Sequence, residues 1–190
     1  MKNLKYFFLG LIAFSLVSCE TDIIDVVDEF TFESGGYMRT VTPFPVVNAT
    51  FSVSKANPGG TKMELVAEAV TKNFGALFAN YDMVIKFVDN SPANGNKSTT
   101  DKTLKSYTAS QFTKDPVTSY PRATVTVTGA EALTATGLTV TDVTKGDFFT
   151  ISATMVLTDG KKFNAANTGL NITGGAFYSS PFSYRINVAD

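Results

Sequence analysis

The chain has 190 residues, of which 44% are hydrophobic, and its 16 basic and 17 acidic residues give a formal net charge of −1. This balance argues against a nucleic-acid-binding protein, because binding to a phosphate backbone demands clustered Lys and Arg side chains. The chain contains no histidine, so Ser–His–Asp and Cys–His catalysis are excluded and zinc binding is disfavoured.

The N-terminal residues have the composition of an export signal. Lys2 and Lys5 precede an apolar run, residues 6–17, which at about a dozen residues is shorter than the ~20 that a membrane-spanning helix needs. The signal ends in four residues that resemble the lipobox of bacterial lipoproteins: Leu16, Val17, Ser18 and Cys19. The resemblance implies cleavage before Cys19, diacylation of its thiol and acylation of the new amino terminus. An uncleaved signal or a buried structural cysteine is the alternative.

Removal of residues 1–18, which carry two of the basic residues and no acid, leaves 172 residues with a net charge of −3. We expect residues 19–34 to form an acidic lipidated tether and residues 35–190 to form a single domain. Five of the ten residues 20–29 are acidic, a composition that resembles the surface-export signal of Bacteroidota lipoproteins and equally fits a solvated tether. The acidic balance disfavours anionic lipid headgroups, so the acyl chains alone should attach the protein to the membrane.

From residue 30 onward the dominant hydrophobic period is two, which predicts β-strands. The expected strands, in chain order, are residues 51–54, 62–70, 81–88, 122–128, 149–157, 161–164 and 182–188. Residues 62–70 also fit a short helix, and we take them as a strand. Residues 130–136 predict a two-turn helix that ends at Gly137, and Asp159-Gly160 predicts a hairpin turn. Roughly eight short strands with almost no helix predict an all-β, antiparallel sandwich, with a small β-barrel as the alternative.

The loops between these strands contain few residues suited to catalysis or metal binding. We expect exposed loops at residues 57–60, 89–100 and 171–180, which are rich in Gly, Pro, Asn or Ser. The second loop and its edge offer oxygen ligands for calcium over thirteen residues: Asp89, Asn90, Ser91, Asn94, Asn96 and Asp101. They lack the order of a known calcium loop, so we interpret the segment as a plain turn and expect no metal or cofactor.

Three carboxylates lie inside expected strands, namely Glu64, Glu68 and Asp82. A carboxylate pair is the remaining route to acid–base catalysis, as in glycoside cleavage. Glu64 and Glu68 share a face in either a strand or a helix, but a solvated sheet face is the simpler interpretation. We therefore expect no enzyme and assign no catalytic residue.

Aromatic side chains are the candidates for ligand binding. Sugar-binding sandwiches usually present a flat aromatic platform, and because the chain has no Trp, Tyr must serve. Tyr107, Tyr120 and Tyr178 lie in or beside polar loops and are the best-placed candidates. The densest aromatic stretch, residues 177–182, is interpreted first as a corner that closes one end of the core.

Several short segments give the chain a wider resemblance: residues 16–19, 35–40, 146–148, 157–160 and 180–184. Through them it resembles small lipoproteins of Bacteroidota that accompany starch-utilisation-type (Sus) outer-membrane uptake systems. The resemblance implies an immunoglobulin-like β-sandwich with a role in glycan capture or transporter support. We therefore expect a non-enzymatic outer-membrane lipoprotein, at the cell surface or on the periplasmic face. Its expected partner is a polysaccharide; the alternative is a transporter or another protein in an assembly.

Overall fold

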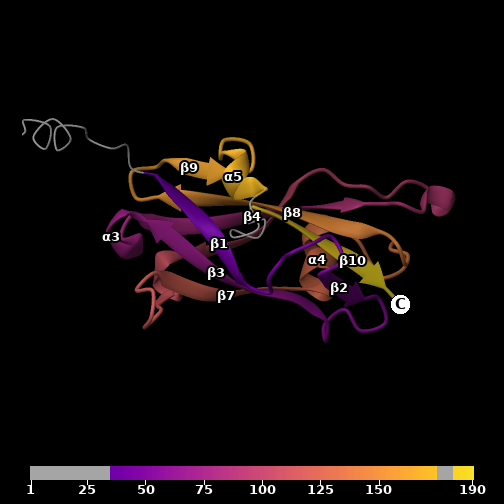
Figure 1. Ribbon diagram of the computed structural model, residues 1–190. Coiled ribbons are helices and arrows are strands. Elements are labelled where there is room, and N and C mark those ends of the chain that lie inside the picture. The colour runs from indigo at the N-terminus through magenta and orange to yellow at the C-terminus, as the bar shows by residue number, and fades with distance from the viewer. Residues whose placement is uncertain (1–34, 175–181) are drawn as a thin grey trace, which may run out of the picture. The chain divides into compact units, whose positions relative to one another are not determined.

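The computed structural model describes residues 35–174 and 182–190 (Figure 1). The expected signal, Cys19, the tether and Tyr178 lie outside these residues, so the structure does not test them. The strands, in chain order, are β1 (Gly36–Thr42), β2 (Phe51–Ser54), β3 (Lys62–Thr71), β4 (Phe78–Val88), β5 (Lys102–Thr108), β6 (Thr113–Lys114), β7 (Pro121–Thr128), β8 (Phe148–Leu157), β9 (Lys162–Asn164) and β10 (Ser183–Ala189). The helical segments are α3 (Lys72–Gly75), η1 (Pro92–Asn94), η2 (Ala109–Gln111), α4 (Gly129–Thr136) and α5 (Leu170–Thr173).

The described strands form two sheets, one ordered β1-β3-β7-β6 and the other β2-β10-β8-β4-β5, with β9 pairing to β8. An immunoglobulin domain divides its strands A to G in the same way, with A-B-E-D in one sheet and G-F-C in the other. The expected immunoglobulin-like sandwich is thereby confirmed over the barrel. One pair departs from an all-antiparallel arrangement, since β2 runs parallel to β10.

The core lies between the sheets because inward positions alternate with outward ones along each strand. In β8 the buried side chains are Phe149, Ile151, Ala153, Met155 and Leu157. In β3 Met63, Leu65, Ala67 and Ala69 are buried and belong to the same hydrophobic cluster. Residues 62–71 are therefore a strand, and the helical alternative is wrong.

The predicted hairpin and helix are both present. The Asp159-Gly160 turn connects β8 to β9, and Gly160 has a φ of 83°, which a residue without Cβ adopts at little cost. Helix α4 begins with a capping box, in which Thr128 and Glu131 satisfy each other's backbone N–H groups, and ends at Gly137. Thr154 of β8 pairs with β9, whereas Ser152 pairs with Ser183 of β10. Strands β9 and β10 thus lie along the same side of β8 and are separated in sequence by residues 165–182.

Three strands were not expected. β1 has an alternating pattern, with Met38 and Thr40 buried, but its small and polar residues hide the pattern. β5 is an edge strand with no fully buried residue, and β6 has two residues, so neither has a strong period. In the described part of the chain, no helix is long and apolar enough to cross a membrane.

Candidate functional site

A shallow groove of about 610 Å³ lies where β1 begins, and we call it the end groove. Three aromatic side chains line it: Tyr37, Tyr120 and Phe163. Polar side chains also line it, among them Lys72, Asn167 and Thr168. The volume falls in the range of about 300–1,000 Å³ typical of small-molecule sites.

Close approach of β1 to its neighbours shapes the groove. Side chains alternate along β1, and because Met38 and Thr40 are buried, Tyr37 points outward. In the strand register Tyr37 lies opposite Val70 of β3. At Gly36 a Cβ would lie 2.9 Å from Thr71 Cγ2 and 3.2 Å from Met155 Cε. Only glycine fits this position without moving its neighbours.

The α3 turn forms the next part of the rim. Asn73 and Phe74 have φ values of 56° and 54°, and Gly75 has 83°, so three consecutive residues are left-handed. For a residue as bulky as Phe this conformation costs about 1–2 kcal/mol. Phe74 is 57% exposed, and the centroid of its ring lies 5.7 Å from that of Tyr120. The turn therefore holds an exposed aromatic side chain directly beside a groove-lining tyrosine.

A row of charges crosses the outer face of the β1-β3-β7 sheet next to the groove. Glu68 of β3 lies opposite Arg39 of β1 and Arg122 of β7 in the strand register. Arg39 Nε donates to Glu68 Oε1 at 2.9 Å, and Arg39 Nη2 lies 2.7 Å from the same oxygen. Arg122 Nε donates to Glu68 Oε2 at 2.7 Å. Thr118 Oγ1 donates to the same Oε2 at 3.0 Å. We call these four residues the charge ladder.

The charge ladder continues into the β6–β7 turn that carries Tyr120. Arg122 Nη1 lies 2.6 Å from Asp115 Oδ2. The backbone N–H of Thr118, at 2.8 Å from Asp115 Oδ1, together with the N–H of Val117 and the Arg122 charge, lowers the pKa of Asp115. The ladder thus connects β1, β3 and this turn, and so supports the wall that Tyr120 contributes to the groove.

The three candidate carboxylates do not form a catalytic pair. Glu64 and Glu68 share the outer face of β3, as predicted, but four residues of strand separate their Cα atoms by about 13 Å. Their carboxylates also pair with different cations, Glu64 with Lys62 and Glu68 with Arg39 and Arg122. The expected solvated face is correct for Glu64, which is exposed and pairs with Lys62. It is wrong for Glu68, which is buried and bonded to Arg39, Arg122 and Thr118. Asp82 on β4 accepts a hydrogen bond from Ser106 at 2.6 Å.

Of the two candidate tyrosines within the described residues, one lines the end groove. Tyr120 does so, whereas Tyr107 of β5 is part-buried against the core. The Tyr107 hydroxyl accepts from Thr126 N–H at 3.0 Å and donates to Thr126 C=O at 3.1 Å. Tyr107 therefore covers the edge of β7, where those backbone groups have no strand partner.

The oxygen-rich loop has a structural explanation in its own backbone. Asp89 accepts N–H hydrogen bonds from Ser91 at Oδ1 and from Lys97 at Oδ2, both at 2.9 Å. Asn96 accepts from the N–H of Ser98. Among the described residues, no group of three or more His, Cys, Asp or Glu side chains could hold a metal ion.

Sequence reasoning missed four residues at the groove or its rim: Tyr37, Lys72, Phe74 and Phe163. The alternation along residues 36–42 is weak because these residues are mostly small or polar, but it is the one local pattern that assigns Tyr37 to an outer face. No sequence signal could place Phe163 of β9 beside it, because more than a hundred residues separate the two in the chain.

Comparisons with known proteins leave the family open. No protein-family model and no curated protein matches the chain. One solved structure that it matches is AggA, the major subunit of aggregative adherence fimbriae type I from Escherichia coli. The match has 11% identity and a TM-score of 0.28, and covers 84% of this chain and 97% of AggA. At that score it supports no conclusion, so the fold assignment depends on strand order and the functional assignment on the end groove.

Proposed function

We propose that the end groove binds a glycan and that the protein is a non-enzymatic accessory lipoprotein of the outer membrane. The observation that carries the proposal is the convergence of Tyr37, Tyr120 and Phe163 on one groove. Tyr37 belongs to β1, Tyr120 directly precedes β7, and Phe163 belongs to β9. The pairing of distant strands therefore brings the three side chains together.

The chemistry of the lining suits a sugar. Half-exposed aromatic rings offer apolar faces to the C–H face of a pyranose, and a Tyr hydroxyl adds a polar tip. The amide of Asn167 and the hydroxyl of Thr168 can exchange hydrogen bonds with sugar hydroxyls. Among the described residues that line the groove there is no Asp or Glu, which favours capture over hydrolysis.

A second candidate function, docking on a transporter or another assembly partner, is favoured by a different surface. Between β1 and β2, Phe44 and Val47 are 59% and 57% exposed. Two large apolar side chains exposed within four residues of one loop are a candidate protein contact. This segment follows the end of β1, whereas the end groove lies at the start of that strand.

Affinity electrophoresis of the mature chain on a panel of polysaccharides tests the glycan proposal. We expect retardation by at least one polysaccharide, and substantial loss of it in Tyr37→Ala and Tyr120→Ala. Phe44→Ala is the matched control, since it removes an exposed aromatic ring outside the groove and should leave retardation unchanged. Absence of retardation across the panel, or equal losses in all three variants, would overturn glycan binding in the groove. A loss of partner cross-linking confined to Phe44→Ala would favour the docking function.

Membrane attachment is tested separately. Cys19→Ser should move the protein from the membrane fraction to the soluble fraction, because the proposed acyl chains would have no attachment point. Retention of the variant in the membrane fraction would refute lipidation as the anchor.

A further inference from the structure

On the basis of the proposed glycan function, we infer that the ligand is an anionic polysaccharide whose carboxylate or sulfate groups are recognised by the α3 turn. In this inference Lys72 supplies the cation and Phe74 extends the aromatic surface beyond Tyr120. The turn is thus the part of the site that determines which glycan binds.

The charge of the lining supports an anionic ligand. Among the described residues that line the groove, Lys72 is the one charged side chain, and there is no carboxylate. Five other lysines are held in ion pairs, namely Lys62, Lys97, Lys105, Lys145 and Lys161. Lys72 is in none of the ion pairs of the described residues. Its exposed ammonium group, on a flexible stem, can therefore pair with a charge on the ligand.

The conformation of the turn supports a binding role for Phe74. Phe74 takes a left-handed conformation that glycine or asparagine would adopt at lower cost. Burial does not explain this conformation, because more than half of the residue's surface is exposed. Backbone strain of this kind clusters at ligand sites, where the surrounding structure maintains it. Contact with the Tyr120 ring makes Phe74 continuous with the groove-lining aromatic side chains.

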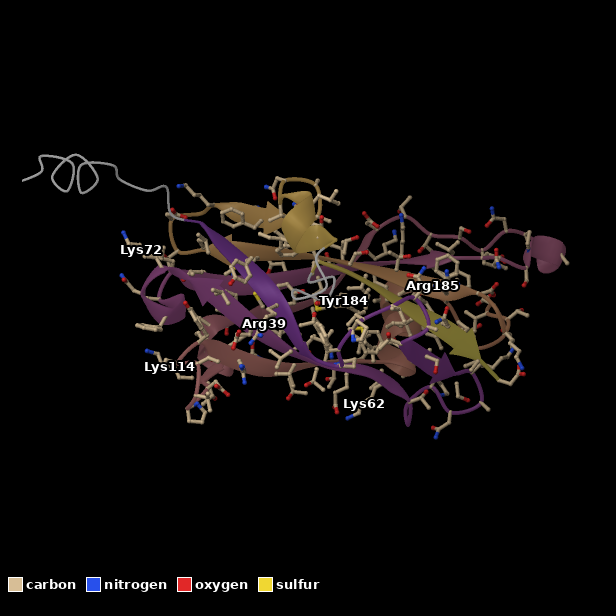
Figure 2. The ribbon with its side chains drawn as sticks, viewed as in Figure 1. Arg39, Lys62, Lys72, Lys114, Tyr184 and Arg185 are labelled. Carbon is tan, nitrogen blue, oxygen red and sulfur yellow. The ribbon has the colours of Figure 1, made fainter. Side chains whose placement is uncertain are left out.

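The same end of the domain provides matched controls. Lys114 of β6 is exposed and lies, like Lys72, at the left end of the view in Figure 2, but it does not line the groove. Val117, in the β6–β7 turn, is an exposed apolar side chain that is likewise absent from the lining. Lys114→Gln and Val117→Ala therefore change charge and apolar surface close to the site without changing the site.

The experiment uses the mature chain with three probes: polygalacturonate for carboxylates, dextran sulfate for sulfates, and dextran as the neutral reference. We expect one anionic probe to bind and dextran to bind more weakly. Lys72→Gln should weaken the anionic interaction by up to about fivefold, as for an exposed ion pair, and added NaCl should weaken it further. Phe74→Gly, which accepts the left-handed backbone, should also weaken binding while the melting temperature stays within a few degrees of the parent.

The outcomes separate the anionic inference from glycan binding itself. Binding of polygalacturonate would identify carboxylate as the recognised group, and binding of dextran sulfate would identify sulfate. Equal binding of dextran and both anionic probes, unaffected by Lys72→Gln, would overturn the anionic inference while leaving glycan binding intact. Binding of none of the probes and of nothing in the wider panel would overturn both. Equal losses in Lys72→Gln and Lys114→Gln would show a diffuse charge effect and would also overturn the role of the turn.

Discussion

Replacement of Glu68 by alanine should destabilise the fold more than any other single change on the outer face of its sheet. Glu68 is 2% exposed, and its two carboxylate oxygens accept three hydrogen bonds, from Arg39, Arg122 and Thr118, besides the ion-pair contact with Arg39 Nη2. Alanine removes the negative charge and leaves two guanidinium groups facing each other. Breaking a buried ion pair by deleting one partner costs about 3–5 kcal/mol.

The exposure of the arginines places the expected value at the lower end of that range. The side chains of Arg39 and Arg122 are 19% and 23% exposed, so water can partly solvate them once Glu68 is gone. We expect a loss of about 3 kcal/mol, equivalent to a fall in melting temperature of roughly 6–12 °C for a domain of this size. Urea unfolding at neutral pH, with the m value checked for constancy, measures the change.

Glu64→Ala is the matched control because Glu64 lies on the same face of the same strand. Its side chain is 48% exposed and pairs with exposed Lys62, so its removal should cost at most about 0.5 kcal/mol. We attribute the cost in stability to the burial of the charge and not to charge pairing alone. Equal losses of unfolding free energy for Glu64→Ala and Glu68→Ala would refute this attribution. Replacing Arg39 and Glu68 together with Met and Leu should recover part of the loss, since Arg122 still pairs with Asp115 and no guanidinium group then lacks a partner.

Three further predictions concern buried polar groups. Asp147→Ala should cost about 2–4 kcal/mol, because the buried Asp147 carboxylate accepts two backbone N–H groups at 2.7 and 2.9 Å that would lose their partner. Burial raises the pKa of Tyr81 well above its ordinary value, and burial raises that of Tyr184 also. The unfolded chain therefore releases these protons first, so stability should be intact below about pH 10 and fall as the pH rises above it. Tyr107→Phe should cost about 1–2 kcal/mol, because the N–H and C=O of Thr126 lose the hydroxyl that bonds both.

Each of these predictions has its own check by urea unfolding. Asp147→Asn keeps one acceptor and should lose less than Asp147→Ala; an equal loss would contradict the hydrogen-bond explanation. Tyr81→Phe should reduce the alkaline loss of stability, and an unchanged pH dependence would contradict the assignment to the tyrosines. A Tyr107→Phe variant as stable as the parent would leave Tyr107 with no demonstrated structural role, and its candidacy for ligand binding would regain weight.

Local patterns in the sequence were enough to predict the architecture. Alternation along residues 149–157 identified β8 because that central strand has one face in the core, and the same reasoning identified β3 and β4. The start of α4 and the hairpin turn depend on side chains and glycines within a few residues of each other. The weak patterns belong to β1 and β5, which are edge strands and gain less of their stability from an apolar face.

The tertiary structure alone decided which residues could form a site. Glu68 looks like a solvated strand residue until the strand register places Arg39 and Arg122 on either side of it. Tyr107 looks like a loop aromatic until β5 is seen to cover the edge of β7. The end groove unites Tyr37 with Phe163, which no local period relates. Local periodicity reports which face a side chain is on, whereas a site depends on strand order and register, and these arise only when distant segments pair.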